Sequence, residues 1–204
     1  MGTHHPILES MASTMNLKEL KRDTVFKAHL KGFDFVFHTT WGLFCPTAID
    51  KGTSLLIDRL DVDEGDTCLD LGCGYGPIGL TMARLSNSGK IYMVDKDFVA
   101  VEYAQKNVEN NGLQNCEVLL SNAFSHLPEI QFDVIASNLP ANVGKELLRI
   151  ILLEARAHLK PNGKFYVVTI SGLREFIKRN FKEIFGNYRK VKQGRNHTVA
   201  LAIR

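Results

Sequence analysis

The stretch LDLGCGYGPIGL, residues 69–80, decides the fold, because it joins an apolar run to four glycines and a proline. The run TCLDL (67–71) has the composition of a short buried strand, and residues 77–85 have the apolar spacing of a helix. Glycines between a strand and a helix permit unusual backbone angles and a close approach to a ligand. The stretch therefore predicts a strand, a tight ligand-binding loop and a helix.

Residues 74–79 (GYGPIG) have the spacing G-x-G-x-x-G of dinucleotide-binding loops. Two neighbouring features argue against a phosphate ligand. The carboxylate of Asp70 directly precedes the loop and would repel a pyrophosphate, and Pro77 lacks a backbone N–H that a phosphate would use. A cationic ligand without phosphate fits both features, and S-adenosylmethionine, with its sulfonium and ammonium groups, is such a ligand.

Strand-like and helix-like segments alternate after this loop. Strands are expected at 67–71, 90–95, 116–121, 132–138 and 164–170, and helices at 77–85, 98–111, 144–158 and 173–185. A β-hairpin (24–30 and 33–39) and a helix within 48–60 precede them, and two antiparallel strands (188–193 and 197–204) follow. This order predicts an α/β protein. We expect a Rossmann-like, doubly wound, mostly parallel seven-stranded sheet with an antiparallel last strand, plus the N-terminal hairpin and helix.

The chain has 204 residues, of which 45% are hydrophobic, enough for one well-packed domain. We expect residues 1–15 to be a disordered lead or a cloning remnant and residues 16–204 to form a single domain. Within it, 16–62 would form the hairpin and helix and 66–204 the cofactor-binding core. No signal peptide or membrane-spanning run is evident. The four cysteines form no C-x-x-C pair, which favours reduced thiols, a cytoplasmic location and no metal site.

Polar residues lie at or just past the ends of four of the predicted strands: Asp70, Asp95, Asn122 and Asn138. Parallel strands bring such residues to one edge of the sheet, where ligands of these folds bind. We expect the Asp70 carboxylate to attract the cationic end of S-adenosylmethionine and the Asp95 carboxylate to accept from its ribose hydroxyls. Asn122 and Ala123 would contact the adenine. Backbone at the loop glycines would approach the cofactor closely, at Gly72, Gly74 and Gly76.

These motifs, LDLGCGYGPIGL, then VDKD with Asp95 and Lys96, then SNAF, resemble those of class I S-adenosylmethionine-dependent methyltransferases. The segment FHTTWGLFCPTAIDKGTSLLIDRL, residues 37–60, further resembles the "methyltransferase small domain" family, whose best-known members methylate N2 of guanine in ribosomal RNA. The resemblance implies that Phe44 and Gly52-Thr53 lie near the cofactor. For Phe44 and Trp41, ordinary core packing is the alternative.

The substrate motif of that family is Asn-Pro-Pro followed by an aromatic residue, and here it reads Asn138-Leu139-Pro140-Ala141. The resemblance assigns catalysis to Asn138, Leu139 and Pro140, with the Asn138 side-chain oxygen and the carbonyl of Leu139 accepting hydrogen bonds from the amine. Leu139 keeps that carbonyl and, preceding a proline, stays extended.

Ala141 lacks the ring on which a target base would stack, a contact of roughly 1–3 kcal/mol. Either another ring (Trp41, Tyr75 or Phe124) takes its place, or the substrate is not a flipped base.

Residues 145–204 hold 14 of the 25 Lys and Arg but 4 of the 22 Asp and Glu. Clusters occur in the last predicted helix and in the two closing strands: Arg174, Lys178, Arg179, Lys182, Arg189, Lys190, Lys192 and Arg195. Such a surface fits an RNA backbone, while a solvated charged surface is the alternative.

The sequence thus favours an S-adenosylmethionine-dependent N-methyltransferase of an RNA base, with guanine N2 first, acting as a monomer or homodimer. A methyltransferase of a protein side-chain amide or a small molecule is the second hypothesis. A non-catalytic cofactor-binding interaction protein is the third.

Overall fold

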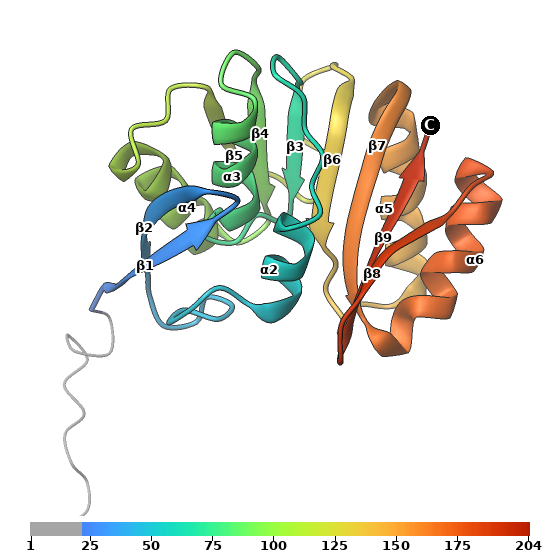
Figure 1. Ribbon diagram of the computed structural model, residues 1–204, viewed down its shortest axis with the longest axis horizontal. Coiled ribbons are helices and arrows are strands. Elements are labelled where there is room, and N and C mark those ends of the chain that lie inside the picture. The colour runs from blue at the N-terminus through green and yellow to red at the C-terminus, as the bar shows by residue number, and fades with distance from the viewer. Residues whose placement is uncertain (1–21) are drawn as a thin grey trace, which may run out of the picture.

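A seven-stranded sheet forms the centre of the computed structural model, which describes residues 22–204 (Figure 1). The strand order is β5-β4-β3-β6-β7-β9-β8. The parallel strands are β3 (Cys68–Leu71), β4 (Ile91–Asp95), β5 (Cys116–Leu120), β6 (Phe132–Asn138) and β7 (Leu159–Ile170). Strand β9 (His197–Ile203) pairs antiparallel with β7, and β8 (Arg189–Gln193) pairs antiparallel with β9 at the edge. The predicted Rossmann-like fold is confirmed. The lead expected at 1–15 and the domain start expected at residue 16 lie outside the described residues.

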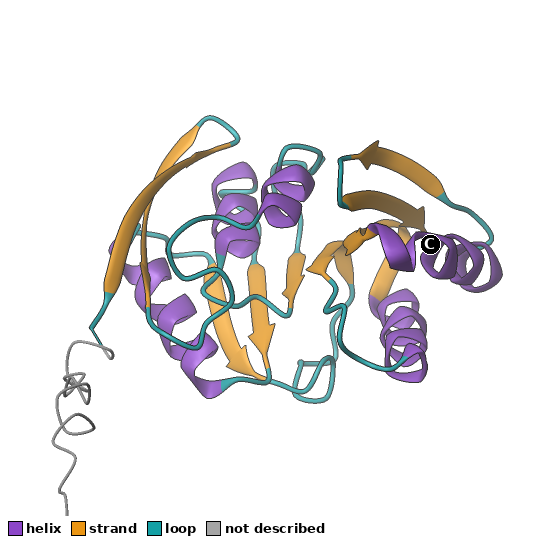
Figure 2. Cartoon of the chain, turned by 90° about the horizontal axis from the view of Figure 1, so that it is seen from below, coloured by secondary structure: helices purple, strands orange, loops and turns teal. Residues whose placement is uncertain are grey.

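Helices cover both faces of the sheet (Figure 2). One core cluster joins the sheet to α2 (Lys51–Ile57), α3 (Pro77–Leu85), α4 (Phe98–Asn110) and the hairpin. The other joins it to α5 (Lys145–His158) and α6 (Arg174–Phe185), which the short 3-10 turn η1 (Ser171–Leu173) connects to β7. Both faces are apolar because each parallel strand is covered on two sides. None of the helices between residues 22 and 204 has the length and apolar content that crossing a membrane requires.

The N-terminal hairpin, β1 (Thr24–Leu30) and β2 (Phe33–Thr39), has the bounds that the sequence predicts. It forms its own two-stranded sheet, which two asparagines at the C-terminal end of α4, one within the helix and one capping it, attach to the core. The side-chain oxygen of Asn107 accepts from the N–H of His38 at 2.7 Å, and Asn111 binds both backbone groups of Val36. Asp23 adds contacts to Tyr103 and Lys106. These bonds fix the start of the loop 40–50, which leads from β2 to α2.

Strand β7 begins at Leu159, five residues before the expected start at 164. The sequence PNG at 161–163 predicts a turn, and the pairing with β6 is indeed irregular between Phe132 and Val134. Asn162 takes a positive φ of 65°, and its N–H donates to the carbonyl of Arg204 at 2.9 Å. The last residues of the chain thus hold this irregular segment in the sheet, and nothing local in the sequence indicates that contact.

Candidate active site

A cavity of about 500 Å³ opens at the carboxyl edge of the sheet, the lower edge in Figure 1. Its walls come from the glycine loop after β3, from the residues that follow β4 and β5, from the end of β6 and from the loop 40–50. Most of the residues predicted for the site line it: Phe44, Thr53, Gly72, Gly74, Asp95, Lys96, Asn122, Ala123, Asn138, Leu139 and Pro140. The topology therefore brings together residues that the sequence separates by up to 96 positions.

Two of the three loop glycines shape the cavity, and the third packs inside the protein. Gly72 and Gly74 have φ angles of 74° and 56°, and a Cβ atom added to either would meet no atom within 4 Å. Their backbone is therefore open to a ligand. Gly76 has a φ of 100°, and a Cβ atom there would lie 2.6 Å from the Cε of Met93. Gly76 is not among the residues that line the cavity, and close packing against Met93 requires a glycine there; its contact with a ligand stays a prediction.

Asp70 also lies beneath the cavity rather than on its wall. The carboxyl group is fully buried; its Oδ2 accepts from the N–H of Gly79 at 2.7 Å, and its Oδ1 has no hydrogen-bond partner among the described residues. Burial, with Asp95 nearby, raises the pKa of Asp70 to about 7 against the lowering effect of the Gly79 N–H. This carboxyl group joins the loop to the start of α3, and its attraction for the cationic end of a cofactor stays a prediction.

Asp95 connects the glycine loop to α4 and faces the cavity. Its Oδ2 accepts from the N–H of Gly74 at 2.9 Å, and its Oδ1 accepts from the N–H of Asp97 at 3.0 Å. Because each carboxylate oxygen has more than one lone pair, both can still accept from a ligand hydroxyl. The geometry fits the ribose contact that the sequence predicts.

Asn138 is held by two residues that precede the glycine loop. Its amide nitrogen donates to the hydroxyl of Thr53 at 2.9 Å and to the Oδ2 of Asp50 at 3.2 Å. The same Asp50 oxygen caps α2 by accepting from the N–H of Thr53 at 3.0 Å. An ionised carboxylate can only accept, so it fixes which end of the amide faces it. The carbonyl oxygen of Asn138 is thereby left for a ligand.

Leu139 continues the line of β6 past Asn138. The N–H of Leu139 donates to the carbonyl of Val168 at 3.1 Å, which continues the pairing of β6 with β7 by one residue. Pro140 and Ala141 follow on the cavity wall and are exposed. Because Ala141 carries only a methyl group, this part of the wall has no aromatic ring.

Phe44 and Trp41 are 65% and 60% exposed, so core packing is wrong for both. Phe44 lines the cavity. Tyr75 is buried, and its hydroxyl donates to the carbonyl of Ala48 at 3.1 Å, tying the glycine loop to the loop 40–50. Phe124 is buried and stacked on His158 at 4.6 Å between ring centroids. Neither buried ring is free to stack on a base.

Asp50, His197 and Cys73 are among the cavity residues that were not predicted from the sequence. The spacing Asp50-x-x-Thr53 is a helix N-cap pattern and could have indicated Asp50. His197, at the start of β9, has no local signal. Burial, with Asp70 and Asp95 nearby, raises the pKa of Cys73 well above its usual range, so this thiol is neutral and a poor nucleophile.

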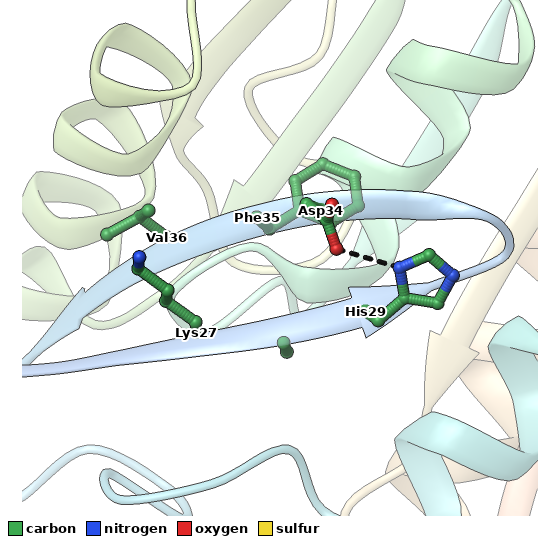
Figure 3. Close-up of a pocket in the computed structure, with 6 residues that line it drawn as sticks. Lys27, His29, Asp34, Phe35 and Val36 are labelled. Carbon is green, nitrogen blue, oxygen red and sulfur yellow. Dashed lines mark hydrogen bonds and ion pairs between the residues drawn. The ribbon is translucent and has the colours of Figure 1, made fainter.

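A second hollow, about 480 Å³, lies on the hairpin and is lined by Lys27, Ala28, His29, Asp34, Phe35 and Val36. Figure 3 shows the ring of His29 facing the carboxylate of Asp34, with Nδ1 and Oδ1 2.8 Å apart. Both side chains are exposed. Between residues 22 and 204, no group of three or more His, Cys, Asp or Glu is placed to hold a metal ion.

Residues 34–200 match the family described as "Methyltransferase small domain". The chain belongs to the methyltransferase small domain family. The chain is similar in sequence to the "Uncharacterized protein YbxB" of Bacillus subtilis. The two are 37% identical over 141 residues, which cover 68% of this chain and 70% of YbxB. The match supports the predicted family and includes the whole of the glycine loop and the β6 end.

Among solved structures, this methyltransferase small domain is similar to the Thermus thermophilus 16S rRNA N2 G1207 methyltransferase RsmC in complex with AdoMet and guanosine. The TM-score is 0.81 and the identity 29%, over 89% of this chain and 50% of that chain. The chain thus spans about half the length of the RsmC chain. A ribosomal protein L11 methylase from Lactobacillus delbrueckii is similar in fold alone, with a TM-score of 0.62 and 20% identity.

Proposed function

We propose that this methyltransferase small domain transfers a methyl group from S-adenosylmethionine to the exocyclic N2 of guanine in RNA. The observation that carries the proposal is the orientation of Asn138, whose amide nitrogen is engaged by Thr53 and Asp50. The likeness to RsmC, which is solved with AdoMet and guanosine, supports the choice of cofactor and of base.

The residues of the cavity fit S-adenosylmethionine. The open backbone at Gly72 and Gly74 leaves space for the methionine part, and Asp95 offers carboxylate oxygens to ribose hydroxyls. Asn122 and Ala123 form the wall next to it, at the position expected for the adenine. When bound, the cofactor supplies an electrophilic methyl group on a sulfonium.

An exocyclic amine is a weak nucleophile because the ring delocalises its lone pair. The carbonyl oxygen of Asn138 and the backbone carbonyl of Leu139 accept its two N–H bonds and direct the lone pair along the line of transfer. Positioning of this kind lowers the activation barrier by roughly several kcal/mol. The nitrogen gains the methyl group as the carbon–sulfur bond breaks, and it releases one proton to water. No covalent enzyme intermediate is needed, in agreement with a neutral Cys73.

A protein side-chain amide or a small molecule is the second candidate acceptor. The observation that favours it is the absence of a ring at Ala141, which is exposed on the cavity wall. A non-catalytic role in binding other proteins is a third candidate, and the anchored amide of Asn138 counts against it, because an inactive site has no need to orient that group.

The deciding experiment is transfer of radiolabelled methyl from S-adenosylmethionine to total RNA and total protein in parallel, with Asn138→Ala as the control. Label in RNA that depends on Asn138 and is released as N2-methylguanosine supports the proposal. Label in protein instead supports the second candidate. Cofactor binding with no label in RNA, protein or a metabolite extract supports the third.

We also propose that residues 16–204 act as one domain, because Asn107 binds the hairpin and Asp50 and Thr53 of the N-terminal part bind Asn138 of the core. Monomer and homodimer both remain compatible with this arrangement. The cysteines Cys45, Cys68, Cys73 and Cys116 are free thiols, which supports the proposal of a cytoplasmic location.

A further inference from the structure

One exposed aromatic ring lines the cavity, and two more follow or precede cavity residues closely in the chain. Phe44 is part of its wall, Trp41 precedes it by three residues in the same loop, and Phe98 follows the cavity residue Lys96 by two. They are 65%, 60% and 66% exposed, respectively. Large rings are usually covered in a folded domain, so an exposed ring on the wall of a cavity indicates a surface that a ligand or partner covers.

Phe44 can take the place of the ring that the Ala141 position lacks. Both residues line the cavity that contains Asn138. A base held with its amine at Asn138 therefore lies in a space that the Phe44 side chain borders. No buried ring competes for this role, because Tyr75 and Phe124 are packed in the core.

The turn between β8 and β9 brings positive charge to the same edge (Figure 1). Its His197 lines the cavity, and the carbonyl of Asn196 accepts from the N–H of Ser171 at 2.9 Å. A Cβ atom at Gly194 would lie 3.3 Å from the Cδ2 of Leu55 in α2. The turn is thus packed against the helix whose first residues hold Asn138.

Four exposed cations have no ion-pair partner between residues 22 and 204. Lys96 lines the cavity, Lys51 begins α2, Lys192 lies near the end of β8, and Arg195 lies in the turn. The nearby acids Asp50 and Asp97 cap helices, and Glu146 is exposed at the start of α5. Unpaired cations beside exposed rings are the combination that single-stranded nucleic acids recognise, since phosphates need charge and bases need stacking partners.

The expected RNA surface on α6 is less suited. Glu183 pairs with Arg149, and Glu175 contacts both Arg174 and Lys178. Helix α6 also leaves the carboxyl edge, because it begins after β7 ends there and runs back along the sheet (Figure 1).

We propose, on the basis of the function proposed above, that the substrate is an unpaired RNA segment lying across the cavity mouth. Phe44 stacks on the acceptor base, and Lys192 near the end of β8 and Arg195 in the β8–β9 turn neutralise phosphates beside it. Duplex RNA is excluded as the form bound, because paired bases present no free face to Phe44.

The test is fluorescence anisotropy with a labelled, unstructured RNA of about 12 nucleotides containing one guanine, a length within the usual site size. The same sequence annealed to its complement is the second probe. S-Adenosylhomocysteine is present so that no turnover occurs. We expect tighter binding of the single strand, and equal or tighter binding of the duplex overturns the proposal.

Charge is tested with Lys192→Ala/Arg195→Ala against the matched control Arg59→Ala/Arg156→Ala. The control residues are exposed at the ends of α2 and α5 that point away from the carboxyl edge, and neither is in an ion pair with a described residue. The slope of log affinity against log salt should become shallower by about 1.4 in the first variant, at roughly 0.7 per phosphate contact. Equal changes in both variants overturn the local site.

Stacking is tested with Phe44→Ala against Phe44→Tyr. We expect Phe44→Ala to lose about five- to a hundredfold in affinity for the single strand and Phe44→Tyr to retain it. Unchanged affinity in Phe44→Ala overturns the stacking role. So does an absence of single-strand binding to the wild type at about 10⁻⁴ M protein, the upper end of nonspecific affinities.

Methyl transfer separates this inference from the proposed function. In one outcome, N2-methylguanosine forms in RNA in an Asn138-dependent way while neither Phe44→Ala nor the Lys192/Arg195 variant changes RNA binding. That outcome supports the proposed function and overturns the RNA-binding surface inferred here. Label in protein that depends on Phe44 assigns the surface to a protein partner and overturns both.

Discussion

The side chains of Asn138 and Thr53 meet at 2.9 Å, although 85 residues separate them in the chain. Thr53 belongs to the first turn of α2, and Asn138 ends β6. The contact joins the N-terminal part of the domain to the end of the strand on which catalysis is proposed to depend. Loss of this contact should therefore change turnover more than it changes folding.

Thr53→Val keeps the shape of the side chain and removes its hydroxyl. We expect kcat on RNA to fall about three- to tenfold, the effect of one hydrogen bond of roughly 0.5–1.5 kcal/mol, because the Asn138 amide is less firmly oriented. Thr53→Ser retains the hydroxyl and should retain kcat. Equal losses in Val and Ser would show that the methyl group, and not the hydrogen bond, matters.

Asn138→Ala removes both the anchored amide and the acceptor carbonyl. Turnover should fall by about a hundredfold or more, since the amine is no longer positioned, while the affinity for S-adenosylmethionine stays nearly unchanged. Single-turnover kinetics and calorimetry measure the two effects. Retained turnover would remove Asn138 from its proposed role.

Asp95→Ala should weaken the binding of S-adenosylmethionine by about tenfold or more, because it removes a charged acceptor and frees the N–H of Gly74. Calorimetric titration measures the change. Asp97→Ser, which keeps a capping side chain at the start of α4, is the neighbouring control and should bind the cofactor normally. An unchanged affinity in Asp95→Ala would place the ribose elsewhere.

Ala141→Phe restores the ring that the family's substrate motif carries at this position. In the Phe44→Ala background we expect it to recover activity on RNA, by about five- to a hundredfold, if one stacking ring is what that background lacks. Methyl transfer to the same RNA measures the recovery. A further loss would show that the cavity wall at 141 must stay small for another acceptor.

Asp70→Asn should flatten the dependence of stability on pH. The pKa of Asp70 is raised from 3.8 to about 7, chiefly by burial, so the folded state retains a proton that the unfolded chain has lost between these values. The contribution of Asp70 to the free energy of unfolding is fully present below pH 3.8 and is lost as the pH rises to about 7. Urea unfolding at pH 5 and pH 8 should show a smaller difference for Asp70→Asn than for the wild type. An identical difference would mean that Asp70 titrates normally.

The order of the helices and strands could be predicted from the sequence, with most ends within one or two residues. Local patterns are sufficient for this purpose, because apolar periodicity and glycine or proline positions act on neighbouring residues. The largest difference between a predicted and an observed end is at the start of β7, which begins at Leu159, where the backbone of Arg204 holds the chain in the sheet. That contact joins residues 41 to 42 positions apart, which periodicity does not reveal.

The sequence by itself determined the fold and the edge of the sheet at which the cavity lies, because strand-end residues such as Asp95 and Asn138 reach one edge in any parallel sheet of this order. Only the tertiary structure decided the depth of Asp70, the exposure of Phe44 and the approach of His197 to the cavity. These properties depend on which distant segments pack together. A carboxylate one residue from a ligand-binding loop can face the ligand or lie beneath it, and the packing of α3 on β3 makes that choice.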